Sequence, residues 1–441
     1  MIINNNNRSR TRDLAGNSNG AVVSGGAGVS DGAGVSDLAA VSEAAGTGLA
    51  SVIPARAFGG LRIDGVLHSA EKLGDACLAK LASPLTPEHE RAVYGFILDW
   101  IGEGDSILQR SSGTTGVAKD LLLAKSAMIG SAANTLEFFD LRPGDSALLC
   151  LPVDYIAGKM MVVRAIVGGL DLILTEPSGR PALPSRPIDF CAMVPLQVAN
   201  CLASGPPEGG GGDGDGGGDG GGDGGGGGGT LRSIKKLIIG GAEISPELEA
   251  ALQAEPFEAW ATYGMAETCS MVALRRVNGL RPEKDFTAMH GVGLELDERG
   301  CLAIDAAWVG SRIQTNDVAR LSGPGVFRWL GRHDNLINSG GLKIAPEELE
   351  ALIASRFGRV CAMIGLPDAL LGQRLVAVFE GESPPPAIDE VAAALGPDTP
   401  RKVLPKEIVR VASIPRNASF KVDRRTLAAM IAAAAKGPSP R

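Results

Sequence analysis

The chain has 441 residues, of which 44% are hydrophobic and 21% charged, so it is long enough for two or three domains with a large buried core. The formal net charge is -8, and four of the negative charges lie in one tract of glycine and aspartate, so the sequence indicates no basic face for nucleic acid. The seven cysteines form no CxxC pair and only four histidines occur, which argues against a zinc site and favours reduced thiols in a cytoplasmic protein.

Residues 1–58 are predicted to be a disordered leader. Glycine, serine and aspartate interrupt every apolar cluster there, so the stretch lacks the compact apolar run of a secretory signal. A transit-like role for this leader is an alternative that the sequence leaves open. The chain contains no run of about 20 apolar residues, so no membrane span is expected.

An α/β domain is predicted over residues 59–330, with a mixed or largely parallel sheet and helices. A helix is expected at about 87–102, where a proline precedes an apolar stripe. Further helical segments lie between most of the apolar strands, an alternation that is typical of parallel sheets. The expected strands are residues 106–110, 146–152, 170–175, 188–194, 235–240 and 258–263.

The tract from Gly209 to Gly229 contains only glycine and aspartate. Such a tract cannot bury apolar side chains, so it is predicted to be a flexible insert in this domain. Calcium binding is the alternative for an Asp-rich tract. The repeat lacks the apolar position of calcium-binding nonapeptides, which favours the insert.

After about residue 330 the pattern changes. A helix is expected over residues 344–357, where Pro346 and two glutamates precede an apolar stripe. Two strands, a helix, a strand and a last helix follow. This order predicts a small, separate α+β domain over residues 331–437.

The segment 111–119 (SSGTTGVAK) has the composition of a phosphate-binding loop. Gly113 and Gly116 let the backbone approach a ligand, while hydroxyl and backbone N–H groups can surround phosphate oxygens. Lys119 adds a positive charge suited to a polyphosphate. The Walker A spacing is absent. Taken alone, the segment could equally be a mobile turn.

Five further segments bring polar groups to the ends of predicted strands or into loops. The ring of Tyr263 can stack on a base, and the carboxylate of Glu267 can hold Mg²⁺. Asp317 and Arg332 could grip the two hydroxyls of a ribose. The five segments are residues 240–243 (GGAE), 261–268 (ATYGMAET), 315–317 with 331–334 (TND and GRHD), 338–343 (NSGGLK) and 415–424 (PRNASFKVDR).

In this order and spacing, the six segments resemble the adenylate-forming superfamily of acyl-CoA synthetases, luciferases and peptide-synthetase adenylation domains. The match spans roughly residues 88–428. The resemblance implies a ligase that uses ATP, Mg²⁺ and coenzyme A, and whose small C-terminal domain is mobile. It implies a carboxylic acid, ATP and CoA as small-molecule partners, no nucleic acid, and leaves a homo-oligomer open.

The resemblance also implies a role for each matching residue. Lys421, Glu267 and Lys119 would be catalytic, with Glu267 the magnesium ligand and Lys421 bridging the acid carboxylate and the α-phosphate. Asp334 would be the hinge of the small domain. The loop for the thioester-forming step would contain Gly340, Gly341 and Lys343. The ATP-binding residues implied are Ser111, Ser112, Gly113, Thr114, Thr115, Gly116, Lys119, Gly241, Ala242, Tyr263, Gly264, Thr268, Asp317, Arg332 and Lys421.

Three positions depart from the superfamily pattern. Ala266 stands where threonine is usual, and Thr268 is the candidate to supply the missing hydroxyl. Ala118 replaces a common proline, and Phe420 stands where glycine is usual, which restricts the backbone before Lys421. The change at Phe420 bears on the rate of adenylation. Ala266 and Phe420 slightly favour a non-catalytic nucleotide-binding relative as an alternative, which the intact Glu267, Asp317, Arg332 and Lys421 oppose.

The segment 151–164 (LPVDYIAGKMMVVR) resembles the o-succinylbenzoate–CoA ligases of menaquinone biosynthesis, and Tyr155 occupies the place of a gate to the acid pocket. That acid has two carboxylates, so the unreacted one needs a cation or hydroxyls. Lys159, Arg164 and Arg275 are the candidates. The alternative substrate is the acid of another aryl- or medium-chain acyl-CoA synthetase.

Overall fold

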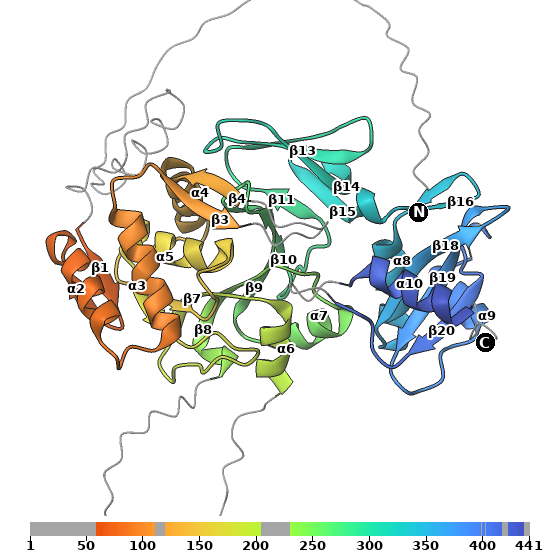
Figure 1. Cartoon of the computed structure of the whole chain (residues 1–441), viewed down its shortest axis with the longest axis horizontal. Coiled ribbons are helices and arrows are strands. Elements are labelled where there is room, and N and C mark those ends of the chain that lie inside the picture. Colours follow the sequence, from red (N-terminus) through yellow and green to blue (C-terminus); the bar gives the residue numbers. More distant parts are fainter. Residues whose placement is uncertain are drawn as a thin grey trace, which may run out of the picture.

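The computed structural model describes residues 59–110, 120–203, 230–397, 399–401, 403–416 and 422–435, which form a large and a small unit, each with its own main sheet (Figure 1). The predicted leader, the segment 111–119, the Gly/Asp tract and Lys421 lie outside the described residues.

Among the described residues, the main sheet of the large unit has 13 strands in the order β12-β13-β14-β15-β11-β10-β9-β8-β7-β5-β6-β1-β2. Six neighbouring strands of this sheet run parallel, from β9 to β1. They are β1 (Leu61–Ile63), β5 (Ser146–Leu149), β6 (Asp171–Leu174), β7 (Ile188–Met193), β8 (Ile234–Ile239) and β9 (Glu258–Met265). The α/β fold predicted from the sequence is therefore confirmed.

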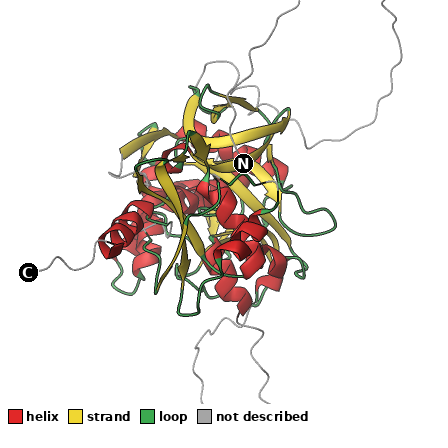
Figure 2. Ribbon diagram, turned by 90° about the vertical axis from the view of Figure 1, so that its right-hand side faces the viewer, coloured by secondary structure: helices red, strands yellow, loops and turns green. Residues whose placement is uncertain are grey.

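Helices cover both faces of the parallel strands (Figure 2). Along β5, Ala147 and Leu149 join the core under α4 and α5, while Leu148 joins the core under α6 and α7. Because both faces are buried, most residues of these strands are apolar, and this is the pattern by which the sequence predicts them. The helices of this unit are α2 (Ala70–Ala82), α3 (Glu88–Ile101), α4 (Lys125–Phe138), α5 (Ile156–Gly168), α6 (Pro195–Ala203) and α7 (Pro246–Leu252), with a 3₁₀ turn η1 (Leu231–Ser233).

The other half of the main sheet is antiparallel, and it was not among the strands predicted from the sequence. It continues from β9 through β10 to β12 at the far edge, while β2 pairs antiparallel with β1 at the opposite edge. These strands are β2 (Val66–His68), β10 (Ser270–Arg276), β11 (Phe286–Ala288), β12 (Val292–Leu296), β13 (Cys301–Ala306), β14 (Ile313–Gly323) and β15 (Val326–Arg332).

The predicted strand at 106–110 is present as β3 (Ser106–Arg110), but it lies outside the main sheet. It pairs antiparallel with β4 (Asp120–Ala124) in a two-stranded sheet, so the two strands that flank segment 111–119 are neighbours. The exposed Leu108 and Leu122 sit directly opposite each other on this ribbon.

The small unit begins after β15. A 3₁₀ turn η2 (His333–Asn335) connects β15 to a sheet in the order β17-β16-β19-β18, with β20 parallel to β19. Helices α8 and α9 cover one face of this sheet and α10 covers the other. The predicted domain border at residue 330 falls inside β15. The elements are β16 (Ile337–Ser339), β17 (Leu342–Ile344), α8 (Pro346–Phe357), β18 (Cys361–Asp368), β19 (Gly372–Glu380), α9 (Ile388–Leu395), β20 (Glu407–Val411) and α10 (Arg424–Ala435). None of the described helices is long and apolar enough to cross a membrane.

Candidate nucleotide-binding site

The carboxyl ends of the parallel strands β8 and β9 lie next to each other and carry two of the predicted motifs. Strand β8 ends at Ile239, and at the next residue, Gly240, a β-carbon would lie 2.3 Å from Oγ1 of Thr262 on β9, so any larger residue would displace Thr262. Gly241 follows with a φ of +83°, and both Gly241 and Ala242 are exposed. A ligand can therefore lie flat on this backbone, at the edge where open α/β sheets bind ligands.

Three predicted residues from three strands meet beside this edge. The hydroxyl of Tyr263 on β9 donates to Oδ2 of Asp317 on β14 at 2.8 Å. Asp317 is directly opposite Arg332 on β15, and its Oδ1 lies 3.6 Å from Nη1 of Arg332. Burial, followed by the nearby Asp317, raises the pKa of Tyr263 far above its usual range, so the phenol remains a hydrogen donor.

Packing fixes the ring of Tyr263. Its centroid lies 5.1 Å from that of Phe327 at 76°, an edge-to-face contact, and 6.0 Å from that of Phe286. Asp317 is only 7% exposed, yet a carboxylate has acceptor sites beyond those used by Tyr263 and Arg332. The arrangement is an acceptor and donor pair whose positions the packing around Tyr263 fixes.

Asp334 lies in the η2 turn that connects the two units. Its Oδ2 is 3.1 Å from Nη2 of Arg332, and the side-chain amide of Asn316 donates to it at 3.3 Å. Asn316 was not among the predicted site residues, although it lies between Thr315 and Asp317. The predicted hinge is thus in direct contact with the predicted ribose pair.

The turn after β9 carries Glu267. Its side chain is exposed, and no described residue forms a hydrogen bond or ion pair with its carboxylate. Thr268, in contrast, is fully buried, and its Oγ1 bonds to the backbone of Met265 and Ser270. The expectation that Thr268 binds ATP in place of the hydroxyl missing at Ala266 is therefore wrong, because the hydroxyl is used within the turn.

Tyr155 and Lys159 lie next to the strand that leads into segment 111–119. Tyr155 precedes α5 and is 49% exposed. Nζ of Lys159 donates to the carbonyl of Leu108 at 2.8 Å. The buried side chain of Gln109 donates to the carbonyls of Arg110 and Asp154, which ties the segment before Tyr155 to β3. No sequence pattern had indicated this role for Gln109.

Two predicted acid-pocket residues lie elsewhere. Arg164 is 1% exposed within α5 and cannot contact an acid that enters from solvent. Arg275 pairs with Glu249 at 2.5 Å, donates to the carbonyl of Glu283 and stacks over Phe286. Both assignments to the acid pocket are therefore corrected.

Gly340 and Gly341 form the two-residue turn of the β16–β17 hairpin, with φ of +58° and +84°. Two successive residues with positive φ are typical of a type I′ turn, which explains why both positions are glycine. Lys343 is exposed on β17, opposite Asn338.

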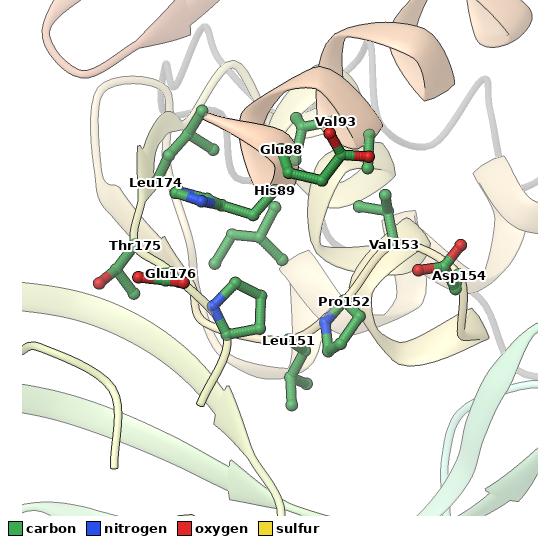
Figure 3. A pocket seen from close by; sticks show the side chains of 13 residues that line it. Glu88, His89, Val93, Leu151, Pro152, Val153, Asp154, Leu174, Thr175 and Glu176 are labelled. Atoms are coloured by element: carbon green, nitrogen blue, oxygen red, sulfur yellow. The ribbon is translucent and has the colours of Figure 1, made fainter. Parts of the chain in front are cut away.

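A cavity of about 370 Å³ lies at the carboxyl ends of β5 and β6, and the segment 151–154 forms part of its wall (Figure 3). Its lining combines apolar side chains with one histidine and three carboxylates. The lining residues come from three separate stretches, so no sequence pattern indicated the cavity. They are Glu88, His89, Ala92, Val93, Leu149, Leu151, Pro152, Val153, Asp154, Leu174, Thr175, Glu176 and Pro177.

Known proteins share both the sequence pattern and the fold. A profile described as AMP-binding enzyme matches residues 104–298. The crystal structure of an acyl-CoA synthetase (AMP-forming)/AMP-acid ligase II-like protein from Dyadobacter fermentans is 30% identical, covers 80% of this chain and 97% of its own, and aligns with a TM-score of 0.51. This chain belongs to the AMP-binding family of acyl-CoA ligases. The predicted family and enzyme class are confirmed.

Within this family, relatives with different acids are similar to the chain. The "Probable 2-succinylbenzoate–CoA ligase" of Mycobacterium tuberculosis is 27% identical over 351 residues, which cover 74% of this chain and 85% of that protein. A long-chain-fatty-acid–CoA ligase of the same species is 22% identical, covering 74% and 67%. The o-succinylbenzoate CoA synthetase of Bacillus subtilis, solved with ATP and magnesium ion, is 19% identical with a TM-score of 0.58 and shares the fold, covering 73% and 69%.

Proposed function

We propose that this ligase joins o-succinylbenzoate to coenzyme A, consuming ATP and passing through an acyl-adenylate. The observation that carries the nucleotide half of the proposal is the Asp317–Arg332 pair, held by Tyr263 beside the exposed end of β8. A carboxylate and a guanidinium side by side suit two ribose hydroxyls, while Gly241 and Ala242 leave room for a flat base.

Glu267 suits the magnesium ion that this reaction needs. Its carboxylate is exposed and has no described protein partner. Magnesium in nucleotide sites usually takes one or two carboxylates and completes its shell with phosphate oxygens and water. Glu267 would hold the ion, which when bound neutralises charge on the departing diphosphate.

In the first step, a carboxylate oxygen of the acid attacks the α-phosphorus of ATP, and the bond to the bridging oxygen of the β-phosphate breaks. Diphosphate leaves and the acyl-adenylate stays on the ligase. Lys421, Lys119 and the rest of segment 111–119 are predicted to align the charged groups, so catalysis rests on positioning and charge neutralisation.

In the second step, the CoA thiol attacks the acyl carbon of the adenylate. The bond to the phosphate oxygen breaks, AMP leaves, and the thiol proton passes to solvent. The proposed movement is a rotation of the small unit at Asp334, which withdraws Lys421 and brings up the hairpin of Gly340, Gly341 and Lys343. Asp334 lies at the connection between the two units and contacts Arg332 and Asn316 there, and these contacts support the proposal.

The choice of acid rests on the segment 151–164 and on the 27% identity to the M. tuberculosis relative. Tyr155 and Lys159 remain the residues proposed to meet the acid, with Lys159 the cation for the second carboxylate. Burial lowers the pKa of Lys159, and Asp154 and Asp99 oppose that shift.

A second candidate is an aryl- or medium-chain acid without a second carboxylate. The positions of Arg164 and Arg275 favour it, because two of the three proposed cations are not available to the acid.

The two candidates are separated by measuring thioester formation with o-succinylbenzoate, benzoate, octanoate and palmitate under equal conditions. A site that is built to pair a polar group can reject a ligand without it by about 10⁴. We expect o-succinylbenzoate to have the highest kcat/KM by a wide margin. An equal or higher value for octanoate would replace the aryl dicarboxylate with the second candidate.

A further inference from the structure

Arg164 is buried in the middle of α5 without an acidic partner. It is 1% exposed, and the residues around it from Met160 to Ile166 are all buried. No carboxylate of the described chain forms an ion pair with it. A buried charge without a partner is costly, so a helix position that keeps one calls for an explanation.

The guanidinium of Arg164 points at the turn that carries Glu267. Nη2 donates to Oγ of Ser270 at 3.1 Å, and Nη1 makes a weaker contact with Sδ of Met161 at 3.8 Å. Nε has no partner. Burial lowers the pKa of Arg164 to about 10, so the group is still protonated at neutral pH.

This turn is strained. Cys269 and Ser270 have φ of +53° and +93°, a region that residues other than glycine rarely occupy. Such strain persists only where the surrounding structure over-determines the backbone. The strained residues Cys269 and Ser270 lie two and three positions after Glu267, so contacts from outside the turn are needed to keep this backbone conformation.

Three side chains from other elements supply these contacts. Oγ of Ser131 on α4 donates to the carbonyl of Cys269 at 2.7 Å, and Nε1 of Trp308 donates to the carbonyl of Thr268 at 3.0 Å. Arg164 on α5 is the third, through the side chain of Ser270. Arg164 is the only charged side chain of these three. It contacts Ser270, whose φ of +93° is larger than the +53° of Cys269.

We propose that Arg164 is a positioning residue that acts through Ser270 to hold the 265–270 turn in the form that directs Glu267 at the magnesium ion. The inference rests on the proposed role of Glu267. Partners behind a metal ligand typically change metal affinity by about 10- to 100-fold when they are removed, without contacting the metal. Arg164 thus serves the ligase reaction from beneath the site.

The test uses the full chain with Mn²⁺ as a spectroscopic probe in place of magnesium. Mn²⁺ binding is followed by electron paramagnetic resonance in the presence of α,β-methylene-ATP, which cannot be cleaved to diphosphate. We expect Arg164→Met and Ser270→Ala each to weaken Mn²⁺ binding about tenfold. The double variant should add little to either, because both changes break one contact.

Hydrogen exchange gives a second reading. The backbone N–H of Cys269 donates to the carbonyl of Ala266 at 3.0 Å within the turn. We expect this amide to exchange faster in Arg164→Met and Ser270→Ala than in the parent chain. Arg164→Lys keeps the charge and should restore part of the Mn²⁺ affinity.

Cys269→Ala is the matched control. Cys269 is a buried core residue of the same turn, and among the described residues no hydrogen bond joins its side chain to Arg164, so its loss should lower Tm and leave Mn²⁺ binding unchanged. If Arg164→Met fails to fold, Ser270→Ala carries the test alone.

The outcomes separate this inference from the proposed function. If Glu267→Gln weakens Mn²⁺ binding while Ser270→Ala leaves both binding and exchange within twofold of the parent, the positioning role is overturned. If Glu267→Gln itself leaves Mn²⁺ binding unchanged, the metal assignment under the proposed function fails instead.

Discussion

Asp317 and Arg332 occupy paired positions on β14 and β15, with Oδ1 of the carboxylate 3.6 Å from Nη1 of the guanidinium. The two residues are separated by a hairpin in the sequence, and the ladder between the strands brings them together. Tyr263 approaches the same carboxylate from β9. The contacts of Asp317 with Arg332 and Tyr263 thus bring together residues that are far apart in the sequence.

Replacing Asp317 with alanine should raise the KM for ATP and leave the KM for the acid nearly unchanged. Loss of a charged acceptor from a bound ribose costs about 1.5–3 kcal/mol, which corresponds to roughly a 10- to 100-fold change. The measurement is steady-state kinetics with each substrate varied in turn. Asp285→Ala is the control, since Asp285 pairs with Arg328 on the same strand β15 but four positions before Arg332. Unchanged ATP dependence in Asp317→Ala would move the ribose site elsewhere.

Replacing Tyr263 with phenylalanine should raise the KM for ATP by about three- to tenfold, because it removes one hydrogen bond to a charged group and keeps the ring. The ring contacts with Phe327 and Phe286 should preserve Tm. Thermal unfolding and ATP kinetics check both parts. A large fall in Tm with normal ATP kinetics would mean that the hydroxyl serves the fold and not the site.

Glu350 should make stability depend on pH near neutrality. Burial raises the pKa of Glu350 to about 7, Arg424 at 2.6 Å opposes the rise, and the neighbouring Glu347 adds to it. Three carboxylates, including Glu243 of the large unit, share the surroundings of Arg424. Between about pH 5 and pH 7, Glu350 therefore holds a proton in the folded chain that it has released in the unfolded chain.

This difference in bound protons determines how the free energy of unfolding changes with pH. A folded-state pKa above the unfolded value of 4.5 means that the free energy of unfolding falls as the pH rises from about 5 through 7. We expect Glu350→Gln to have a flatter slope than the parent over this range, measured by urea unfolding at several pH values. The slope is the test, because the substitution also removes the ion pair with Arg424. Equal slopes would show that Glu350 is ionised throughout.

Replacing Lys421 with alanine should abolish acyl-adenylate formation and spare thioester formation from supplied acyl-adenylate and CoA. The reason is that only the first step has a carboxylate and an α-phosphate to bridge. The two half-reactions are measured separately, with Arg425→Ala as a control that removes an exposed cation four residues further on. Equal loss of both half-reactions would contradict the role of Lys421.

Sequence patterns revealed the elements whose surroundings leave a simple signature. Strand β8 was expected at 235–240 and spans Ile234–Ile239. Its last three residues, Leu237 to Ile239, are buried and apolar, which gives the sequence signal. The antiparallel strands from β10 to β15 were missed, since several of them are half-exposed and short and no helices separate them. The motif residues on strand ends, such as Tyr263, Asp317 and Arg332, did come together.

The predictions that were wrong concern where side chains point. Helix α5 is buried on nearly all sides, so periodicity could not show that Arg164 points inward to Ser270 and not to an acid. Arg275 lies on β10, a strand that was not predicted from the sequence, so its neighbour Glu249 on α7 could not be predicted either. Thr268 belongs to a turn whose positive φ values fall on a cysteine and a serine, where no glycine marks them.

A single-turnover experiment tests the central claim most directly. The chain is mixed with α-phosphorus-labelled ATP, magnesium and o-succinylbenzoate without CoA, and the labelled products are separated over time. We predict that labelled acyl-adenylate accumulates to about one equivalent per chain, and that adding CoA converts it to AMP and the thioester. Formation of labelled ADP, or an adenylate that CoA does not consume, would contradict the account.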